Sequence, residues 1–327
     1  MKVIEASRKR FFIRPYKSGD KEKILLLFNE VFNKEKSCQL WTWEFLKNPY
    51  GTQIMLCEQE DGKLVAQCAG IPVPLYFKDK IFLGAQLVDC MCKKEYRALA
   101  IKKRGLFALT VEKFFDEFTG KDKDIYLFGF PGERHFRLGK LLLGYRETRP
   151  IVELKIAALK KDLKTHFFSL TPFNRQDIIK YSSQLGKIAI QDARMLKFCV
   201  LREPKYFLWR YSDCPRHYSI FGLKNILGKL KGLCVLQVER EKIKLIDFIG
   251  INRLKEILIL IWETFHLPIT MWLPKKSLAE AILTPLGAAL NKPALPVIAG
   301  GKTFWTGLNW EWANRHFFYT MGDCDLF

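Results

Sequence analysis

A seven-residue motif occurs twice in this chain, and it limits the folds that the chain can adopt. Residues 43–49 have the sequence WEFLKNP and residues 209–215 the sequence WRYSDCP, so both copies have the form Trp-x-aromatic-x-x-x-Pro. Each copy is followed by a strand pattern, a glycine turn and another strand pattern, and later by an apolar strand that ends at Pro131 or Pro274. This unit is longer than the repeats of solenoid proteins. The pattern therefore predicts a duplicated α/β domain.

The first copy contains an amphipathic helix and several strand patterns. After residues 18–20, the apolar side chains of Ile24, Leu27, Phe28 and Val31 have the spacing of one helix face. The other predicted elements are a strand at 11–15, a short helix at 39–47, hairpin strands at 54–58 and 63–70, strands at 75–77, 81–83 and 85–92, a helix at 105–118 and a strand at 125–130.

The second copy is predicted to start near Asn174, after a junction within residues 150–175. Its predicted elements are a hairpin at 217–238, a strand at 242–249, a helix at 254–264, a strand at 269–273 and a final hairpin strand in the aromatic tail at 309–327. We therefore expect a protein of the α/β (α+β) class with two domains, at residues 1–160 and 161–327.

The charge balance indicates a polyanionic partner. With 54 Lys and Arg against 34 Asp and Glu, the net charge of +20 favours a phosphorylated cofactor, nucleic acid or an acidic membrane surface; the alternative is a general basic background that keeps the protein soluble. The nine cysteines and five histidines are scattered, so a structural metal site is not expected, and the cysteines are typical of a reduced cytoplasmic protein. We expect no secretory signal, because residues 1–16 alternate charged with apolar residues, and no membrane span, because the longest apolar run, 257–262, is too short.

The two copies differ between the third strand and the helix that follows it. Residues 93–105 of the first copy form a long loop, KKEYRALAIKKRG, whereas the second copy has only GINR at 250–253. The start of a helix attracts anions, and three cations there oppose the helix dipole unless an anion lies among them. The loop therefore predicts a pyrophosphate site in the first copy; the alternative is a solvated basic turn.

This order of elements, with the Trp-x-Phe-x-x-x-Pro helix and the Tyr96-Arg97 loop, resembles the GNAT superfamily of acyl-CoA N-acyltransferases. It is most similar to the tandem-domain group with a degenerate second copy, related in plan to Eis-like and FemAB-like transferases. The resemblance implies two GNAT-like domains, each a mixed, mostly antiparallel sheet flanked by helices. It also implies acetyl-CoA or another acyl-CoA as co-substrate, without a metal.

The resemblance implies that residues 87–92 lie along the pantetheine and that 97–105 hold the pyrophosphate. The family loop is Arg/Gln-x-x-Gly-x-Gly/Ala; here Ala100 and Lys102 replace the glycines, and Gly105 is the candidate for close contact. The implied cofactor-binding residues are Cys90, Met91, Cys92, Lys94, Arg97, Ala98, Ala100, Lys102, Lys103, Arg104, Gly105 and Leu106.

Acyl transfer to an amine needs a proton acceptor and a donor to the carbonyl oxygen. The candidate catalytic residues are Asp89, Glu133, His135, Tyr145 and the terminal carboxylate of Phe327. The alternatives are a structural carboxylate for Asp89, a helix cap for residues 133–135 and a structural tyrosine. A covalent route through Cys90 or Cys92 is less favoured, because no histidine lies near them in sequence.

We therefore expect a cytoplasmic N-acyltransferase that moves an acyl group, with acetyl as the expected one, to an amine of a small molecule, amino sugar or peptide. A polycationic acceptor is disfavoured by the basic surface. Two alternatives stay open: a FemAB-like transferase that uses aminoacyl-tRNA, and a non-catalytic scaffold that binds CoA. Nucleic acid is the less favoured partner, because the loop at 96–105 suits CoA.

Overall fold

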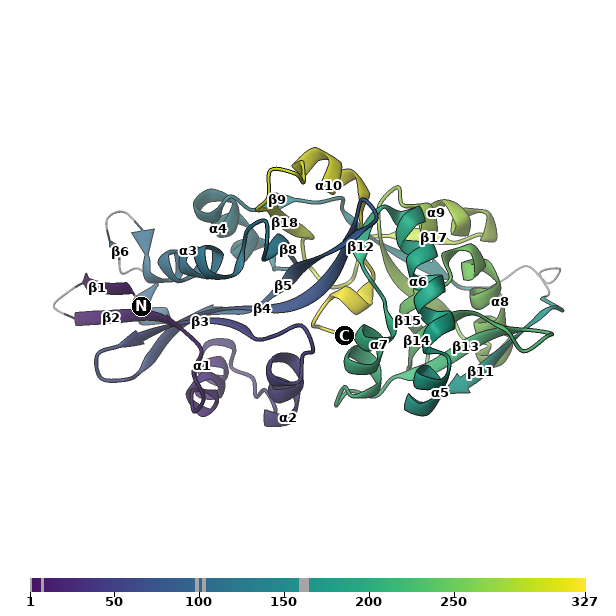
Figure 1. Cartoon of the computed structure of the whole chain (residues 1–327), viewed down its shortest axis with the longest axis horizontal. Helices are drawn as coiled ribbons and strands as arrows, with labels where there is room; N and C mark the ends of the chain where they lie inside the picture. The colour runs from purple at the N-terminus through teal and green to yellow at the C-terminus, as the bar shows by residue number, and fades with distance from the viewer. Residues whose placement is uncertain (1, 7–8, 98–99, 102–103, 159–164) are drawn as a thin grey trace.

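The computed structural model describes residues 2–6, 9–97, 100–101, 104–158 and 165–327. Figure 1 shows two lobes along the long axis, each built around a sheet, with the C-terminal end of the chain between them. No helix in the described part of the chain is long and apolar enough to cross a membrane.

The sheet of the first lobe is mixed and mostly antiparallel. Its order is β1 (Lys2–Ala6), β2 (Lys9–Pro15), β3 (Gln53–Gln59), β4 (Leu64–Phe77), β5 (Lys80–Cys92), β8 (Asp124–Gly129), β18 (Gly300–Thr303) and β9 (Arg146–Glu147). Neighbours are antiparallel except β5 and β8, which are parallel. The predicted hairpins are confirmed, although the strand patterns at 63–77 and 81–92 form two long strands.

The sheet of the second lobe has the same character. Its order is β11 (Phe168–Phe173), β13 (Ser219–Asn225), β14 (Leu230–Val238), β15 (Ile243–Ile249), β16 (Ile269–Pro274), β10 (Ile151–Ile156) and β17 (Ala289–Asn291). Again one pair of neighbours, β15 and β16, is parallel and the others are antiparallel. The fold class predicted from the sequence is therefore confirmed.

Helices flank both sheets (Figure 1). Those of the first lobe are α1 (Lys21–Phe32), α2 (Cys38–Trp41), α3 (Leu106–Phe118) and α4 (Glu133–Leu143); the second lobe has α5 (Arg175–Lys180), α6 (Ser182–Leu196), α7 (Pro204–Phe207), α8 (Leu254–Phe265) and α9 (Leu278–Leu283). In both copies the repeated motif forms a short π-helix, at Thr42–Leu46 and at Leu208–Ser212. The local repeat in sequence is thus a local repeat in structure.

Alternate residues of β3 face two different cores, which explains its almost continuous apolar sequence. Ile54 and Leu56 pack in the core that contains the buried face of α1, whereas Met55 and Cys57 pack in the core that contains α3. The core on the α1 side continues into the second lobe, so the two lobes share buried apolar surface.

The two lobes exchange strands. β10 precedes the second copy of the motif but pairs with β16 and β17, whereas β18 comes from the C-terminal half and pairs with β8 and β9. In addition, β12 (Phe198–Val200) adds to β4 at Leu75–Phe77. β10 lies before the predicted boundary at residue 160 and β18 after it, so each half of the chain contributes a strand to the sheet of the other.

Two predictions about the ends of the chain were wrong or incomplete. The tail was predicted as a strand, but it forms the helix α10 (Trp310–His316), the two-residue strand β19 (Phe317–Phe318) and a 3-10 turn at Met321–Asp323. The Asn309 side chain accepts a hydrogen bond from Trp312 N at 3.0 Å and caps α10, a local preference stronger than the strand propensity of the aromatic residues. The strand β1 was not predicted.

Candidate active site

The candidate site lies where β5 and β8 diverge. The two strands pair in parallel at Leu83/Asp124, Ala85/Leu127 and Gln86/Phe128, and β5 continues to Cys92 beyond the last of these pairs. A cavity of about 210 Å³ opens at the divergence. It is lined by Phe32, Leu87, Val88, Asp89, Cys90, Phe115, Leu127, Phe128, Gly129, Phe130, Pro131, Gly132, His135, Tyr145, Gly300, Gly301, Lys302, Asp325 and Leu326. We call it the β5–β8 cavity.

A β-bulge in β5 shapes one wall of this cavity. Ala69 of β4 pairs with Val88 and Gln67 pairs with Met91, so two residues of β5 lie opposite one residue of β4. Asp89 has a φ of +46°, in the left-handed region that a residue with a side chain rarely adopts. The Gln67 side chain donates to Asp89 O at 3.2 Å and supports this conformation.

A buried lysine binds the carboxylate of Asp89. Lys36 Nζ lies 2.5 Å from Asp89 Oδ2 and also contacts the carboxylate of Glu44, which is 2% exposed. Burial raises the pKa of Glu44 to about 7, against the opposing effect of the Lys36 charge. One lysine thus serves two carboxylates, and Asp89 is held by an ion pair at the cavity wall.

His135 and Tyr145, both predicted as site residues, line the cavity. Burial lowers the pKa of His135, so its neutral form is favoured at neutral pH. The pKa of Tyr145 is raised by burial, and its hydroxyl has no hydrogen-bond partner among the described residues. The structure therefore brings together Asp89, His135 and Tyr145 from three separate segments.

Glu133 and Phe327 lie outside the set of cavity residues. Glu133 is exposed and accepts a hydrogen bond from Arg137 at 2.5 Å on the surface of α4. The main-chain oxygen of Phe327 accepts from Tyr218 Oη at 2.8 Å and from Arg216, both residues of the second lobe.

The sequence did not single out Asp325, Lys302 or Lys36 as site residues. Asp325 lines the cavity, is partly exposed and accepts a hydrogen bond from Gln86 Nε2 at 2.8 Å. Burial, and then the nearby charge of Asp89, raise the pKa of Asp325. Lys302 Nζ donates to Leu143 O at 2.7 Å, and burial lowers its pKa. Asp325 reaches the cavity from the far end of the chain, so no local pattern indicates it.

The predicted cofactor-binding residues fall into three groups. Cys90 lines the cavity, Met91, Cys92 and Leu106 are buried, and Lys94 and Arg97 are exposed, with Arg97 Nε donating to Cys92 O at 2.9 Å. Ala100 and Arg104 lie in β6 (Ala100–Ile101) and β7 (Arg104–Gly105), a two-residue pair. Ala98, Lys102 and Lys103 lie outside the described residues.

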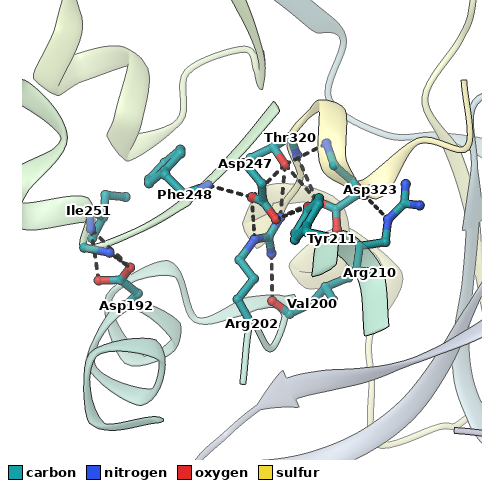
Figure 2. A network of polar contacts seen from close by, with 12 residues as sticks. Asp192, Val200, Arg202, Arg210, Tyr211, Asp247, Phe248, Ile251, Thr320 and Asp323 are labelled. Atoms are coloured by element: carbon teal, nitrogen blue, oxygen red, sulfur yellow. Dashed lines mark hydrogen bonds and ion pairs between the residues drawn. The ribbon is translucent and has the colours of Figure 1, made fainter. Parts of the chain in front are cut away.

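The start of the helix after the third strand differs between the two copies. In the second copy, the carboxylate of Asp192 from α6 accepts hydrogen bonds from Gly250 N at 2.6 Å and from Ile251 N at 3.0 Å (Figure 2). In the first copy, Gly105 is the N-cap residue of α3 and has no side chain that could cap the helix. The second copy thus binds a carboxylate of its own after its third strand, whereas the N-cap residue of α3 in the first copy contributes no side chain.

In the second lobe, Asp247 of β15 is bound by side chains of the same lobe. Arg202 Nε donates to Asp247 Oδ1 at 2.7 Å, and Tyr211 Oη donates to the other oxygen of that carboxylate at 2.6 Å (Figure 2). Thr320 and Asp323 complete this buried network. The second copy is therefore closed by its own side chains.

No group of His, Cys, Asp and Glu side chains within the described ranges has the arrangement of a metal site. The nine cysteines, all of them within these ranges, are free thiols.

Comparison with known proteins identifies a domain in the first lobe. Residues 12–136 match the family model described as an acetyltransferase (GNAT) domain. No curated protein matches the chain.

Among solved structures, a GCN5-related N-acetyltransferase from Anabaena variabilis has a TM-score of 0.68 at 12% identity, over 90% of this chain and 73% of that one. A GCN5-related N-acetyltransferase from Kribbella flavida has a TM-score of 0.66 at 10% identity, over 90% and 71%. Saccharomyces cerevisiae N-myristoyltransferase with bound myristoyl-CoA has a TM-score of 0.56 at 12% identity, over 95% and 84%. The chain therefore contains a GNAT acetyltransferase domain at residues 12–136, and these structural similarities extend the shared fold beyond that domain.

Proposed function

We propose that this chain is an acyl-CoA-dependent N-acyltransferase whose site is the β5–β8 cavity. Past Gln86, the described part of β8 no longer pairs with β5, so main-chain groups of residues 87–92 are available along this edge. An extended chain with amide groups can add to such an edge as a further strand does. The pantetheine arm of CoA has this chemistry, and the proposal lays it along β5.

The observation that carries this proposal is a contrast between the copies: Asp192 accepts hydrogen bonds from Gly250 N and Ile251 N in the second copy, whereas the N-cap residue of α3 in the first copy is Gly105, which has no side chain. Main-chain N–H groups at a helix start bind anions. We assign the diphosphate of CoA to the start of α3, with Arg97, Arg104, Lys102 and Lys103 supplying positive charge and Gly105 allowing close approach. The remaining assigned contacts are Cys90, Met91, Cys92, Lys94, Ala98, Ala100 and Leu106.

The transfer is proposed to be direct. Holding the thioester carbonyl against a neutral amine supplies much of the rate enhancement. Main-chain N–H groups at the bulge of Asp89 and Cys90 are the proposed donors to the developing oxyanion. Acetyl-CoA is the proposed acyl donor. The structure of yeast N-myristoyltransferase with bound myristoyl-CoA shows that a protein of similar fold binds an acyl-CoA with a longer acyl group.

The acceptor is proposed to be an amine of a small molecule, an amino sugar or a peptide. Two carboxylates, Asp89 and Asp325, lie at the cavity and favour a single ammonium group there. The basic balance of the whole chain disfavours an acceptor with many positive charges. Free thiols suit a reducing compartment, and the cytoplasm is the proposed one.

A second candidate function is a scaffold that binds CoA without turnover, favoured by the replacement of two loop glycines by Ala100 and Lys102. Titration calorimetry with acetyl-CoA, followed by measurement of thiol release with a panel of amines, separates the two. We expect binding and amine-dependent thiol release. Binding without thiol release favours the scaffold, and no binding contradicts both.

A further inference from the structure

The last residues of the chain connect the second lobe to the β5–β8 cavity. We call residues 320–327 the C-terminal segment. Figure 1 shows it in yellow between the lobes, and Figure 2 shows its first residues among buried side chains of the second lobe. Asp325 and Leu326 of this segment line the cavity of the first lobe.

Three arginines of the second lobe bind the C-terminal segment. Arg202 Nη2 donates to Asp323 Oδ2 at 2.5 Å, Arg210 donates to Gly322 O at 3.0 Å and to Cys324 O at 2.9 Å, and Arg216 donates to Asp325 O at 2.6 Å. Arg202 and Arg210 are buried, so these charge-assisted bonds are poorly screened by solvent. The main chain on both sides of the Asp325 side chain is thus fixed from the second lobe.

The space around Gly322 is too small for any side chain. A Cβ atom at Gly322 would lie 2.1 Å from Tyr211 Oη and 3.0 Å from the side chain of Asp247. The main chain of the C-terminal segment therefore packs directly against Tyr211 and Asp247 of the second lobe. From there the segment reaches the β5–β8 cavity at Asp325 and Leu326.

The Asp325 carboxylate is bound to the last paired residue of β5. Gln86 donates to its Oδ1 at 2.8 Å, and Gln86 is the β5 member of the last parallel pair before the strands diverge. The charged groups that act on this carboxylate are Asp89 of β5, Lys36 before α2, and Arg210 of the second lobe. The remaining titratable groups of the cavity are His135, Tyr145, Cys90 and Lys302.

We propose that the Asp325 carboxylate is the proton acceptor for the amine in the reaction, and that the second copy of the domain serves to position it. This inference rests on the proposed acyltransfer. Asp89 is the other carboxylate of the cavity, but its Oδ2 is bound by Lys36 at 2.5 Å. Within the described part of the chain, the hydrogen bond to the Asp325 side chain comes from the neutral amide of Gln86, and Asp325 is partly exposed and lines the cavity.

The proposed step balances in protons and electron pairs. The ammonium group of the acceptor gives one proton to the Asp325 carboxylate and becomes a neutral amine. The amine nitrogen attacks the thioester carbonyl carbon, the carbon–sulfur bond breaks, and an amide and the CoA thiolate form. The second proton lost from the nitrogen neutralises the thiolate, and protonated Asp325 returns its proton to solvent.

The test compares wild type, Asp325→Asn and Asp325→Glu, with Glu311→Gln as a control, since Glu311 is an exposed carboxylate paired with Arg146 away from the cavity. The donor is acetyl-CoA, the nucleophiles are water, glucosamine and triglycine, and thiol release is measured between pH 6 and 10. Calorimetry with acetyl-CoA and thermal unfolding are measured for each variant.

We expect Asp325→Asn to bind acetyl-CoA as wild type does and to lose about a hundredfold in kcat/KM for triglycine at pH 7, the size of a general-base contribution. The loss should shrink above pH 9, because the amine, with a pKa of about 7.7–8.0, is then already neutral. Asp325→Glu should retain part of the activity, and Glu311→Gln all of it.

Wild-type rates in Asp325→Asn, or a loss of equal size at every pH, would overturn the assignment of Asp325 while leaving the acyltransferase intact. A wild-type protein that releases no thiol with any of the three nucleophiles would instead count against the proposed function itself, and the role of Asp325 would fall with it. If Asp325→Asn unfolds, Asp325→Glu takes its place in the comparison. The pH dependence of its thiol release must then differ from that of wild type, and an unchanged pH dependence would overturn the assignment of Asp325.

Discussion

The indole rings of Trp43 and Trp209 stack on each other, with centroids 5.3 Å apart and planes 18° from parallel. Trp43 Nε1 donates to Trp209 O at 2.6 Å, and Trp209 Nε1 donates to Trp43 O at 3.0 Å. The two residues open the two copies of the repeated motif. The copies therefore meet at their equivalent positions, through reciprocal hydrogen bonds.

Charged residues next to these tryptophans continue the same correspondence. Lys36 and Arg202 each precede the motif tryptophan by the same seven residues, and each binds a buried aspartate of the third strand, Asp89 or Asp247. The motif position after the tryptophan is Glu44 in one copy and Arg210 in the other. Glu44 belongs to the ion pairs at the cavity, whereas Arg210 holds the C-terminal segment.

Replacing Trp209 by Ala should destabilise the fold by about 3–5 kcal/mol, because it removes a buried ring and the hydrogen bond that the indole donates to Trp43 O. Trp209→Phe keeps an aromatic ring and loses only the donated bond, so a loss of about 1–3 kcal/mol is expected. Urea unfolding followed by fluorescence measures both. Equal stability of wild type and Trp209→Ala would contradict the pairing.

Asp192→Ala should leave the N–H groups of Gly250 and Ile251 without their acceptor, at a cost on the order of 2–4 kcal/mol. An emptied helix start binds anions, so sulfate should raise the melting temperature of this variant more than that of wild type. Asp177→Ala is the matched control, because Asp177 caps the exposed helix α5 in a capping box. Parallel responses of Asp192→Ala and wild type to sulfate would refute the account.

The buried carboxylate of Asp124 should make stability depend on pH. Burial raises its pKa to about 7, whereas an unfolded chain has about 3.9. Between these values the folded state binds more protons, so the free energy of unfolding falls as pH rises and levels off above about pH 7.

Asp124→Asn removes this dependence. Its free energy of unfolding, relative to wild type, should increase by on the order of 3–4 kcal/mol between pH 4 and pH 8. Asp122→Asn, an exposed neighbour, should run parallel to wild type. Urea titrations at four pH values decide between the two patterns, and a pH-independent difference for Asp124→Asn would show that this carboxylate is not buried in the folded state.

Residues 1–160 expressed alone should not fold into a soluble domain. The fragment lacks β18, which separates β8 from β9, and β12, which covers the end of β4. Circular dichroism and gel filtration of the fragment, with and without co-expressed residues 161–327, measure the effect. A soluble fragment with a cooperative melt would favour independent domains.

The sequence predicted well those elements whose pattern is local. The helices at 106–118 and 254–265 have a 3.6-residue apolar period, and the hairpin around Asp61-Gly62 combines alternating strands with a turn sequence, so each was found within about two residues. The missing elements have no such pattern. In the tail, the Asn309 cap stabilises a helix, although the aromatic residues there favour strands.

The candidate site was predicted only in part, for the same reason. Asp89, His135 and Tyr145 lie in or next to predicted elements of one domain, and all three line the cavity. Asp325 and Lys302 come from the other half of the chain and enter the site through the C-terminal segment and the exchanged strand β18. Partners so far apart are fixed by tertiary packing, which a single sequence does not display.

The central claim, that acyl-CoA binds at the start of α3, is tested most directly by titration calorimetry with acetyl-CoA. The measurement compares wild type with the triple variant Lys102→Ala/Lys103→Ala/Arg104→Ala and with Lys229→Ala/Lys231→Ala/Arg240→Ala, which removes three exposed cations from the second lobe. We predict binding by wild type and by the second-lobe variant, and affinity weakened more than tenfold in the loop variant. Equal affinity of all three proteins, or no heat of binding with wild type, would contradict the account.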